Sequence, residues 1–150
     1  MAKIRIILGS KSDLEACEPI KKTLEDFGVE YDFYVSSAHR KPLATAQLAK
    51  NAENDGIRVI IAAAGMAAHL PGVIASHTIL PVIGVPLASG GLGGLDALLS
   101  IAQMPPGVPV ACLAVGAAKN AALLAIQILS LEDPALREKL RAYKKTLAGG

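Results

Sequence analysis

The sequence is poor in aromatic residues and in cysteine. Of its 150 residues only 3% are Phe, Tyr or Trp, Trp is absent, and the two cysteines stand far apart. The few aromatic rings do not make a base-stacking platform, and two isolated thiols favour neither a disulfide framework nor a cysteine metal site. Cys17 falls in a helical pattern and Cys112 in an apolar run, so we expect both to be buried core thiols.

Long hydrophobic runs and an excess of charge are also missing. No apolar stretch reaches the roughly 18 residues of a membrane span, and the N-terminus leads into a strand pattern instead of a signal peptide. The formal net charge is only +2, with Lys and Arg spread along the chain, which is not the footprint of a nucleic-acid-binding protein. We therefore expect a cytoplasmic protein with neither a membrane nor a nucleic acid as partner.

The chain instead has many small and branched apolar residues, arranged in alternating strand and helix patterns. Strand-like runs cover 4–8, 31–35, 58–64, 80–85 and 108–115. Helical patterns cover 13–27, a stretch from Pro42 to Gly56, 69–77, 92–102, 118–131 and a C-terminal helix at about 134–147. The helix that Pro42 opens is predicted to have an apolar face of Leu43, Ala46, Leu48 and Ala49. This alternation predicts one α/β domain over 1–150, a three-layer doubly wound parallel sheet with strand order 2-1-3-4-5.

Ligands of such a sheet bind beyond the carboxyl ends of the strands, where the winding reverses. The loops predicted at that edge are GSKSD (9–13), SSAHRKP (36–42) and AGMAAHLPG (64–72), followed later by the glycine-rich SGGLGG (89–94). These loops hold the chain's polar chemistry, so the sequence predicts the binding site there.

The first loop permits two interpretations. Gly9 allows a tight turn, and the hydroxyls of Ser10 and Ser12 beside a helix N-terminus would make an anion site. Alternatively, Ser12 and Glu15 form a capping box that needs no ligand. For Ser10 both interpretations stay open, whereas for Ser12 we favour the N-cap. Asp13 suits the helix dipole and would equally suit the hydroxyls of a ribose.

The second loop places His39 beside Arg40. A guanidinium offers a fixed fork of donors that fits a phosphate, and Lys41 adds charge next to it. Arg40 could instead be a solvated loop cation, which is the less favoured interpretation, and a lone histidine is more often structural than catalytic. The position of His39, at a strand end in a loop of small residues, favours an acid/base role.

The third loop consists almost entirely of small residues around Gly65, followed by His69 and Leu70. Such a loop lets a planar ligand lie against the backbone, although close packing of a strand on a helix explains it equally well. His77, on the next helix, is expected to be a surface or packing residue.

Taken together, these loops carry a resemblance to a known family. The segments GSKSD, SSAHRKP, AGMAAHLPG, LPVIGVP, GLDALLSIAQMPPGVPVACLAVG and KNAALLAIQIL resemble the N5-carboxyaminoimidazole ribonucleotide mutase family of purine biosynthesis, in the same order from residue 4 to about 145. The resemblance implies a flavodoxin-like fold, a homo-octamer and an isomerase that works without metal, nucleotide or biotin. Its substrate would be N5-carboxyaminoimidazole ribonucleotide (N5-CAIR) and its product 4-carboxy-5-aminoimidazole ribonucleotide (CAIR).

The resemblance also implies a role for each loop. Ser10 and Arg40 would hold the substrate phosphate and Asp13 the ribose, with Ser12 beside them. The aminoimidazole would lie between two walls, formed by Ser37, Ala38 and His39 on one side and by Gly65, Ala68, His69 and Leu70 on the other. His39 would be the acid/base that moves one proton during carboxyl transfer.

Three positions depart from the family pattern, and two alternatives remain open. The third loop commonly reads GAGGAAHLPG, but here Ala63 and Met66 replace glycines, and Lys41 stands where Thr is common. The related aminoimidazole ribonucleotide carboxylases use CO2 directly, but their third loop lacks the AAHLPG run. A non-catalytic phosphoryl-ligand or flavin module of flavodoxin type would be expected to carry an aromatic pair, and these loops have none.

Overall fold

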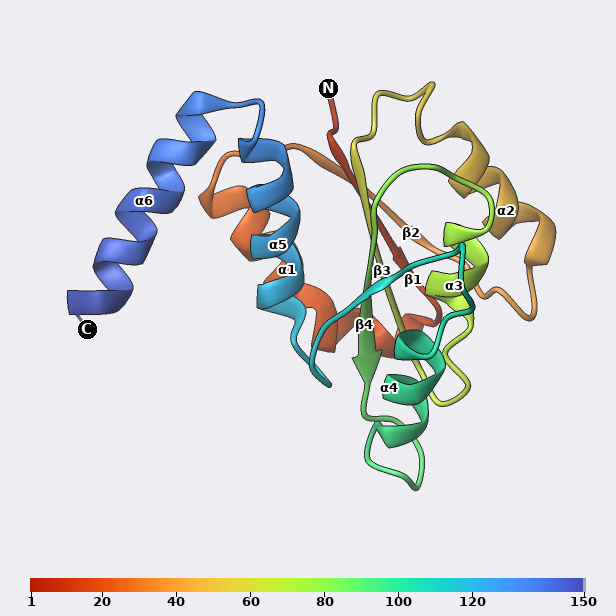
Figure 1. Cartoon of the computed structure of the whole chain (residues 1–150). Helices are drawn as coiled ribbons and strands as arrows, with labels where there is room; N and C mark the ends of the chain where they lie inside the picture. The colour runs from red at the N-terminus through yellow and green to blue at the C-terminus, as the bar shows by residue number, and fades with distance from the viewer. Residues whose placement is uncertain (150) are drawn as a thin grey trace.

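Five apolar runs form one parallel sheet in the computed structural model, which describes residues 1–149 (Figure 1). The strands are β1 (Ile4–Leu8), β2 (Tyr31–Val35), β3 (Val59–Gly65), β4 (Val82–Leu87) and β5 (Ala111–Cys112). Their order is β2-β1-β3-β4-β5, with every pair parallel, which confirms the predicted topology. β1 and β4 are buried along their whole length, as expected of strands covered on both faces.

Helices cover both faces of the sheet (Figure 1). One face carries α1 (Leu14–Asp26), α5 (Ala118–Ser130) and α6 (Pro134–Gly149), and the other carries α2 (Pro42–Asn51), α3 (Leu70–Ala75) and α4 (Leu95–Ala102). The alternation of side chains along β1 divides the core, because Ile6 and Leu8 pack toward α1 and α5 whereas Ile7 packs toward α2 and α3. None of the helices within residues 1–149 is long and apolar enough to span a membrane.

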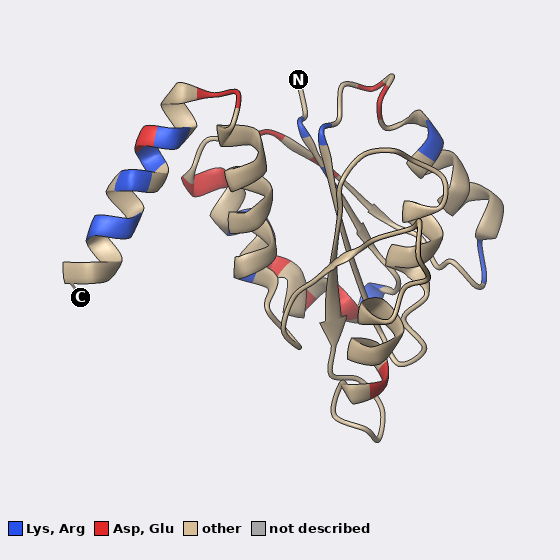
Figure 2. Ribbon diagram, in the orientation of Figure 1, with Lys and Arg blue, Asp and Glu red and all other residues tan. Residues whose placement is uncertain are grey.

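α6 lies outside α5 and extends away from the body of the molecule (Figures 1 and 2). Leu136 is its one buried residue, and Leu140 and Tyr143 pack against the core beside it. The ring of Tyr143 meets Phe27 edge to face, with the ring centroids 5.7 Å apart. Lys and Arg residues recur along the length of α6 (Figure 2).

The last predicted strand and the helix before it are both shorter than expected. The prediction of a strand over 108–115 was wrong, because only Ala111 and Cys112 pair with β4. Prolines crowd the approach to this segment, and they have no N–H to donate to a ladder. α4 begins at Leu95 and not at 92, since Gly93 and Gly94 have φ of 62° and 93° and keep the preceding loop open.

β4 runs two residues beyond the predicted end at Val85, through Pro86 to Leu87. The backbone N and C=O of one strand residue point to the same side, and the Pro86 carbonyl accepts a hydrogen bond from Gly116 on the β5 side. The nitrogen of Pro86 therefore faces the place where β5 has ended. The N–H that proline lacks would have had no β5 carbonyl to pair with, so no ladder hydrogen bond is lost.

Two expectations about burial were also wrong. The predicted apolar face of α2 included Leu43, which is 86% exposed, while the buried residues of this helix are Thr45 and Ala49. Cys17 is buried, and burial raises the pKa of its thiol to about 12, with Asp13 adding to the effect. Cys112 is only half-buried, because β5 is an edge strand of two residues.

A buried guanidinium ties β1 to β2 on the sheet. Arg5 is 2% exposed and donates to both carboxylate oxygens of Asp32, to Asp55 and to the carbonyl of Leu48, at 2.7–3.2 Å. Burial lowers the pKa of Arg5, but the hydrogen bonds to Asp32 and Asp55 outweigh it, and the net direction is upward. The charge is therefore retained inside the fold by its partners.

The carboxylates of Asp32 and Asp55 are expected to contribute unequally to the free energy of unfolding. Asp32→Ala should lower the free energy of unfolding by about 2–3 kcal/mol, because it leaves a buried charge without its bidentate partner. Asp55, whose side chain is 49% exposed, should cost less than about 1 kcal/mol when replaced by Ala. Denaturant unfolding of both variants at one protein concentration measures the difference, and equal losses would contradict it.

Candidate active site

The loops that follow β1, β2 and β3 meet around a cavity of about 400 Å³ at the carboxyl edge of the sheet. All but one of the residues selected from the sequence line it, including Ser10, Asp13, His39 and Arg40. The exception is Ala68, which is buried in the core beneath the loop, whereas the preceding Ala67 lines the cavity. The arrangement therefore brings together groups from three loops far apart in the sequence.

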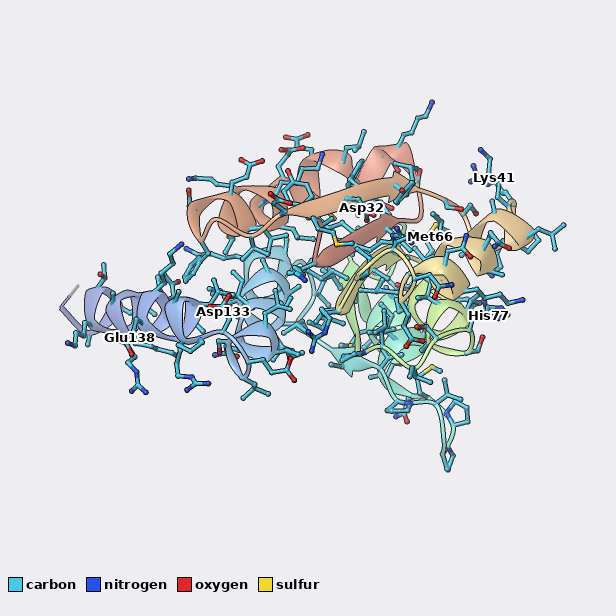
Figure 3. The ribbon with its side chains drawn as sticks, turned by 90° about the horizontal axis from the view of Figure 1, so that it is seen from above. Asp32, Lys41, Met66, His77, Asp133 and Glu138 are labelled. Atoms are coloured by element: carbon cyan, nitrogen blue, oxygen red, sulfur yellow. The ribbon has the colours of Figure 1, made fainter. Side chains whose placement is uncertain are left out.

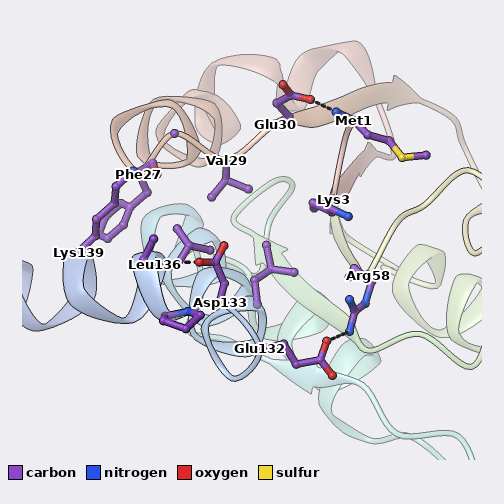
Figure 4. Close-up of a pocket in the computed structure, with 14 residues that line it drawn as sticks. Met1, Lys3, Phe27, Val29, Glu30, Arg58, Glu132, Asp133, Leu136 and Lys139 are labelled. Carbon is purple, nitrogen blue, oxygen red and sulfur yellow. Dashed lines mark hydrogen bonds and ion pairs between the residues drawn. The ribbon is translucent and has the colours of Figure 1, made fainter.

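A second cavity of about 550 Å³ lies at the opposite edge of the sheet, where the chain begins and α5 turns into α6 (Figure 4). Its polar groups are largely engaged with one another. Arg58 pairs with Glu132 at 2.6 Å, Lys139 donates to the carbonyl of Phe27 at 2.9 Å, and Asp133 accepts from the first turn of α6 at 3.2 Å. We interpret it as a structural crevice.

The first loop forms a short 3-10 turn, η1 (Lys11–Asp13), between β1 and α1. Ser10 caps this turn, because its Oγ accepts from the backbone N–H of Ser12 at 3.3 Å. The prediction of Ser12 as N-cap was wrong: α1 has Asp13 at its N-cap position, without a side-chain capping bond. The inserted turn moves the cap to Ser10 and leaves the two serine hydroxyls, 3.0 Å apart, beside the cavity.

Asp13 is a buried carboxylate that also lines the cavity. Burial raises the pKa of Asp13, and a backbone hydrogen bond from Ser10 opposes that shift without cancelling it. The folded chain therefore holds an acceptor that is costly to ionise, at a point where a ligand with hydroxyl donors would compensate.

The raised pKa of Asp13 gives a pH-dependent stability. Below the ordinary aspartate pKa of 3.8 the carboxyl is protonated in both the folded and the unfolded chain. As the pH rises, the unfolded chain ionises first, so the wild-type protein loses stability that Asp13→Asn does not lose. We expect the variant to melt above the wild type near pH 7, with the gap shrinking toward pH 4. Melting temperatures across that range check this, and a gap independent of pH would contradict it.

The second loop is fixed by hydroxyl groups and leaves its two functional side chains exposed. Ser36 bonds the buried hydroxyl of Thr45 at 2.7 Å, and the Oγ of Ser37 accepts from the backbone N–H of Arg40 at 3.2 Å. Among residues 1–149, no ion pair or side-chain hydrogen bond engages the guanidinium of Arg40. It is thus free to bind an anion at the cavity.

The structure adds a contact that sequence reasoning missed, between His39 and His69. His39 Nε2 and His69 Nδ1 lie 2.7 Å apart, with the rings nearly perpendicular at 82°. One proton lies between these two nitrogens, so the tautomer of one ring determines that of the other. A histidine with this partner is held in place and can pass a proton to or from its neighbour.

The third loop approaches the loop between β4 and α4 so closely that a side chain at position 65 would displace the hydroxyl of Ser89. A Cβ on Gly65 would lie 1.8 Å from the Oγ of Ser89. Ser89 lines the cavity and was missed as a site residue, although the glycine-rich loop that begins with it was placed at this edge. Met66 also lines the cavity, and Figure 3 shows it far from Asp133 and Glu138 at the other end of the molecule.

No cluster of three or more His, Cys, Asp or Glu side chains suited to a metal ion is present within the described 149 residues.

Known proteins match this chain over nearly its whole length. The family model described as AIR carboxylase matches residues 3–149. A relative from Pyrococcus abyssi, named N5-carboxyaminoimidazole ribonucleotide mutase, is 55% identical over 147 residues, which cover 98% of this chain and 84% of the relative. A protein of the same name from Saccharolobus solfataricus is 54% identical, covering 98% and 93%. The crystal structure of Treponema denticola PurE superposes with a TM-score of 0.90 at 31% identity, covering 99% of this chain and 93% of that one.

Proposed function

This chain belongs to the AIR carboxylase family, and from that membership we propose that it is an N5-carboxyaminoimidazole ribonucleotide mutase. It converts N5-CAIR into CAIR in purine biosynthesis and is therefore an isomerase. This proposal rests on the match, over 98% of the chain, to relatives of that name at 54–55% identity. We assign the acid/base group and the anion site that this reaction needs to the cavity described above.

The substrate is a phosphorylated ribonucleotide, and the cavity offers a complement for each part of it. We assign the phosphate to the free guanidinium of Arg40 and the hydroxyl of Ser10, and the ribose to the buried carboxylate of Asp13. The imidazole ring would then lie between the Ser37–His39 segment and the loop at Gly65. Anchoring the phosphate orients the ring toward His39, which is the entropic advantage of a bound substrate.

The reaction moves a carboxyl group from nitrogen to carbon and one proton in the opposite direction. The bond between the exocyclic nitrogen and the carboxyl carbon breaks, its electrons remain on nitrogen, and CO2 is released. Ring carbon C4 then attacks CO2, forming the new carbon–carbon bond, and loses its proton. His39 gives a proton to the nitrogen and takes one from C4, so it ends as it began.

His69 supports His39 in this scheme. Because the two rings share one proton at 2.7 Å, His69 holds the His39 ring in one orientation and one tautomer. When the substrate occupies the cavity, this partner can rebalance the charge as His39 alternates between acid and base. No cofactor enters the scheme, as the sequence leads us to expect.

The proposed activity is tested with purified protein and two substrates. Freshly made N5-CAIR is supplied alone in one cell, and aminoimidazole ribonucleotide with bicarbonate in another, and CAIR formation is followed. Rapid conversion of N5-CAIR alone is the expected result. Efficient use of the uncarboxylated nucleotide would instead make the chain a carboxylase, the activity for which its family is described, and no reaction in either cell would leave a binding module.

His39→Asn should abolish turnover while leaving substrate binding nearly unchanged, because it removes the titratable group but keeps a polar side chain of similar size. His77→Asn is the matched control, since His77 lies outside the cavity, and it should retain wild-type turnover. Substantial activity in His39→Asn would remove the proposed role.

We further propose that the protein is a homo-octamer. Support comes from large apolar side chains on the surface of the single chain, among them Leu43 and Ile79, each 86% exposed, and Leu92 at 64%. Light scattering is expected to give about eight times the 15.4 kDa chain mass, and a monomer mass would overturn the proposal. The cytoplasmic location stays a prediction.

A further inference from the structure

Met66 has a backbone conformation that normally belongs to glycine. Within residues 1–149 it is the one non-glycine residue with positive φ, at 55°. A side chain with a Cβ is disfavoured there, and such strain gathers at functional sites. This chain nevertheless carries a thioether side chain at a strained position beside the cavity. The strain indicates that the side chain has a function there.

The Met66 side chain reaches from the loop after β3 to the loop after β4. Its Cγ, Cε and Sδ lie 3.4–3.7 Å from the point that a Cβ on Gly90 would occupy, so the thioether lies against the bare backbone of Gly90. Ser89, the residue before that contact, lines the cavity, as does Met66 itself. The side chain therefore spans the gap between two loops at the margin of the cavity.

The proposed reaction gives a reason for an apolar side chain between these two loops. The CO2 released from nitrogen is small, uncharged and without a hydrogen-bond donor, so the ionic and hydroxyl groups that hold the nucleotide cannot anchor it. Polar groups bind CO2 only weakly, so its retention until C4 attacks depends on walls that close the cavity. An unbranched thioether adapts its shape to such a gap and presents an apolar surface. At 56% exposed in the free chain, it also has room to swing aside for substrate entry.

We propose that Met66 closes the cavity between the loops after β3 and β4 and retains the transferred CO2 beside the imidazole ring. This inference rests on the proposed mutase function and assigns Met66 to a wall of the same site. Met66 takes no part in proton transfer, so its loss should let CO2 exchange with solvent while the chemical steps remain possible.

The test is isotope exchange. Unlabelled N5-CAIR is converted in buffer containing ¹³C-bicarbonate, with carbonic anhydrase added to keep dissolved CO2 labelled, and the ¹³C content of CAIR is measured early in the reaction. A closed cavity gives little label. Met66→Ala is expected to incorporate severalfold more label than the wild type, and to release correspondingly more aminoimidazole ribonucleotide after the uncatalysed decay is subtracted.

Three further variants separate closure from other effects. Met66→Leu restores an apolar side chain of similar size and should return the labelling close to the wild-type value. Met104→Ala removes a thioether outside the cavity and should leave the labelling unchanged. Met66→Gly suits the positive φ and also removes the side chain, so it should leak like Met66→Ala even if the latter folds poorly.

The outcomes distinguish this inference from the proposed function. Equal labelling in the wild type, Met66→Ala and Met66→Gly would overturn the closing role, as would heavy labelling of CAIR made by the wild type. Either result leaves the mutase activity intact, because CAIR has still been formed from N5-CAIR. A wild-type protein that does not convert N5-CAIR at all would instead remove the proposed function itself.

Discussion

The site depends on the hydrogen bonds that hold β1 between β2 and β3. Leu8, the last residue of β1, pairs with Val35 on one side and Ala63 on the other. The ladder continues one step past the strand ends, where Gly9 N donates to the Ala63 carbonyl at 3.0 Å and Ser36 N donates to the Leu8 carbonyl at 2.8 Å. The loops after β1 and β2 therefore leave the sheet at one level, and β3 continues two residues further, to Gly65. A slip of one residue would reverse the faces of a strand and separate the groups that line the cavity.

Small residues let these loops come close enough to share a cavity. Gly65 leaves space for the hydroxyl of Ser89, which would lie 1.8 Å from a Cβ at that position. The same preference explains the scarcity of aromatic residues, since a core of Ala, Val, Ile and Leu allows helices and sheet to approach closely. The scarcity of aromatic residues is thus a condition for bringing four loops to one edge of the sheet.

Local sequence pattern was sufficient for the type and order of the elements, although not for the ends of β4, β5 and α4. Alternating apolar runs predicted the strand order, and the rule for doubly wound sheets placed the loops of Ser10, His39 and Gly65 at the same edge. Errors arose where tertiary contacts decide the outcome. Ser12 is not the cap because a 3-10 turn is inserted before α1, and Leu43 is exposed although it fits an apolar helical face. The bond between His39 and His69 joins residues thirty positions apart, so no spacing rule could have found it.

The two edges of the sheet differ in how their polar groups are satisfied, and this difference marks the functional edge independently of any relative. At the amino edge, Arg58, Glu132 and Lys139 are engaged within the chain. At the carboxyl edge, Asp13 is buried with a raised pKa and Met66 holds a backbone angle that disfavours it. Each of these features costs stability in the free protein, and the buried strands β1 and β4 help to offset the cost. A ligand with an anionic group, hydroxyls and a planar ring would donate hydrogen bonds to the buried carboxylate of Asp13. Its anionic group would bind the guanidinium of Arg40. The carboxyl edge, whose polar groups are the less satisfied within the free chain, is thus the edge at which a substrate would bind.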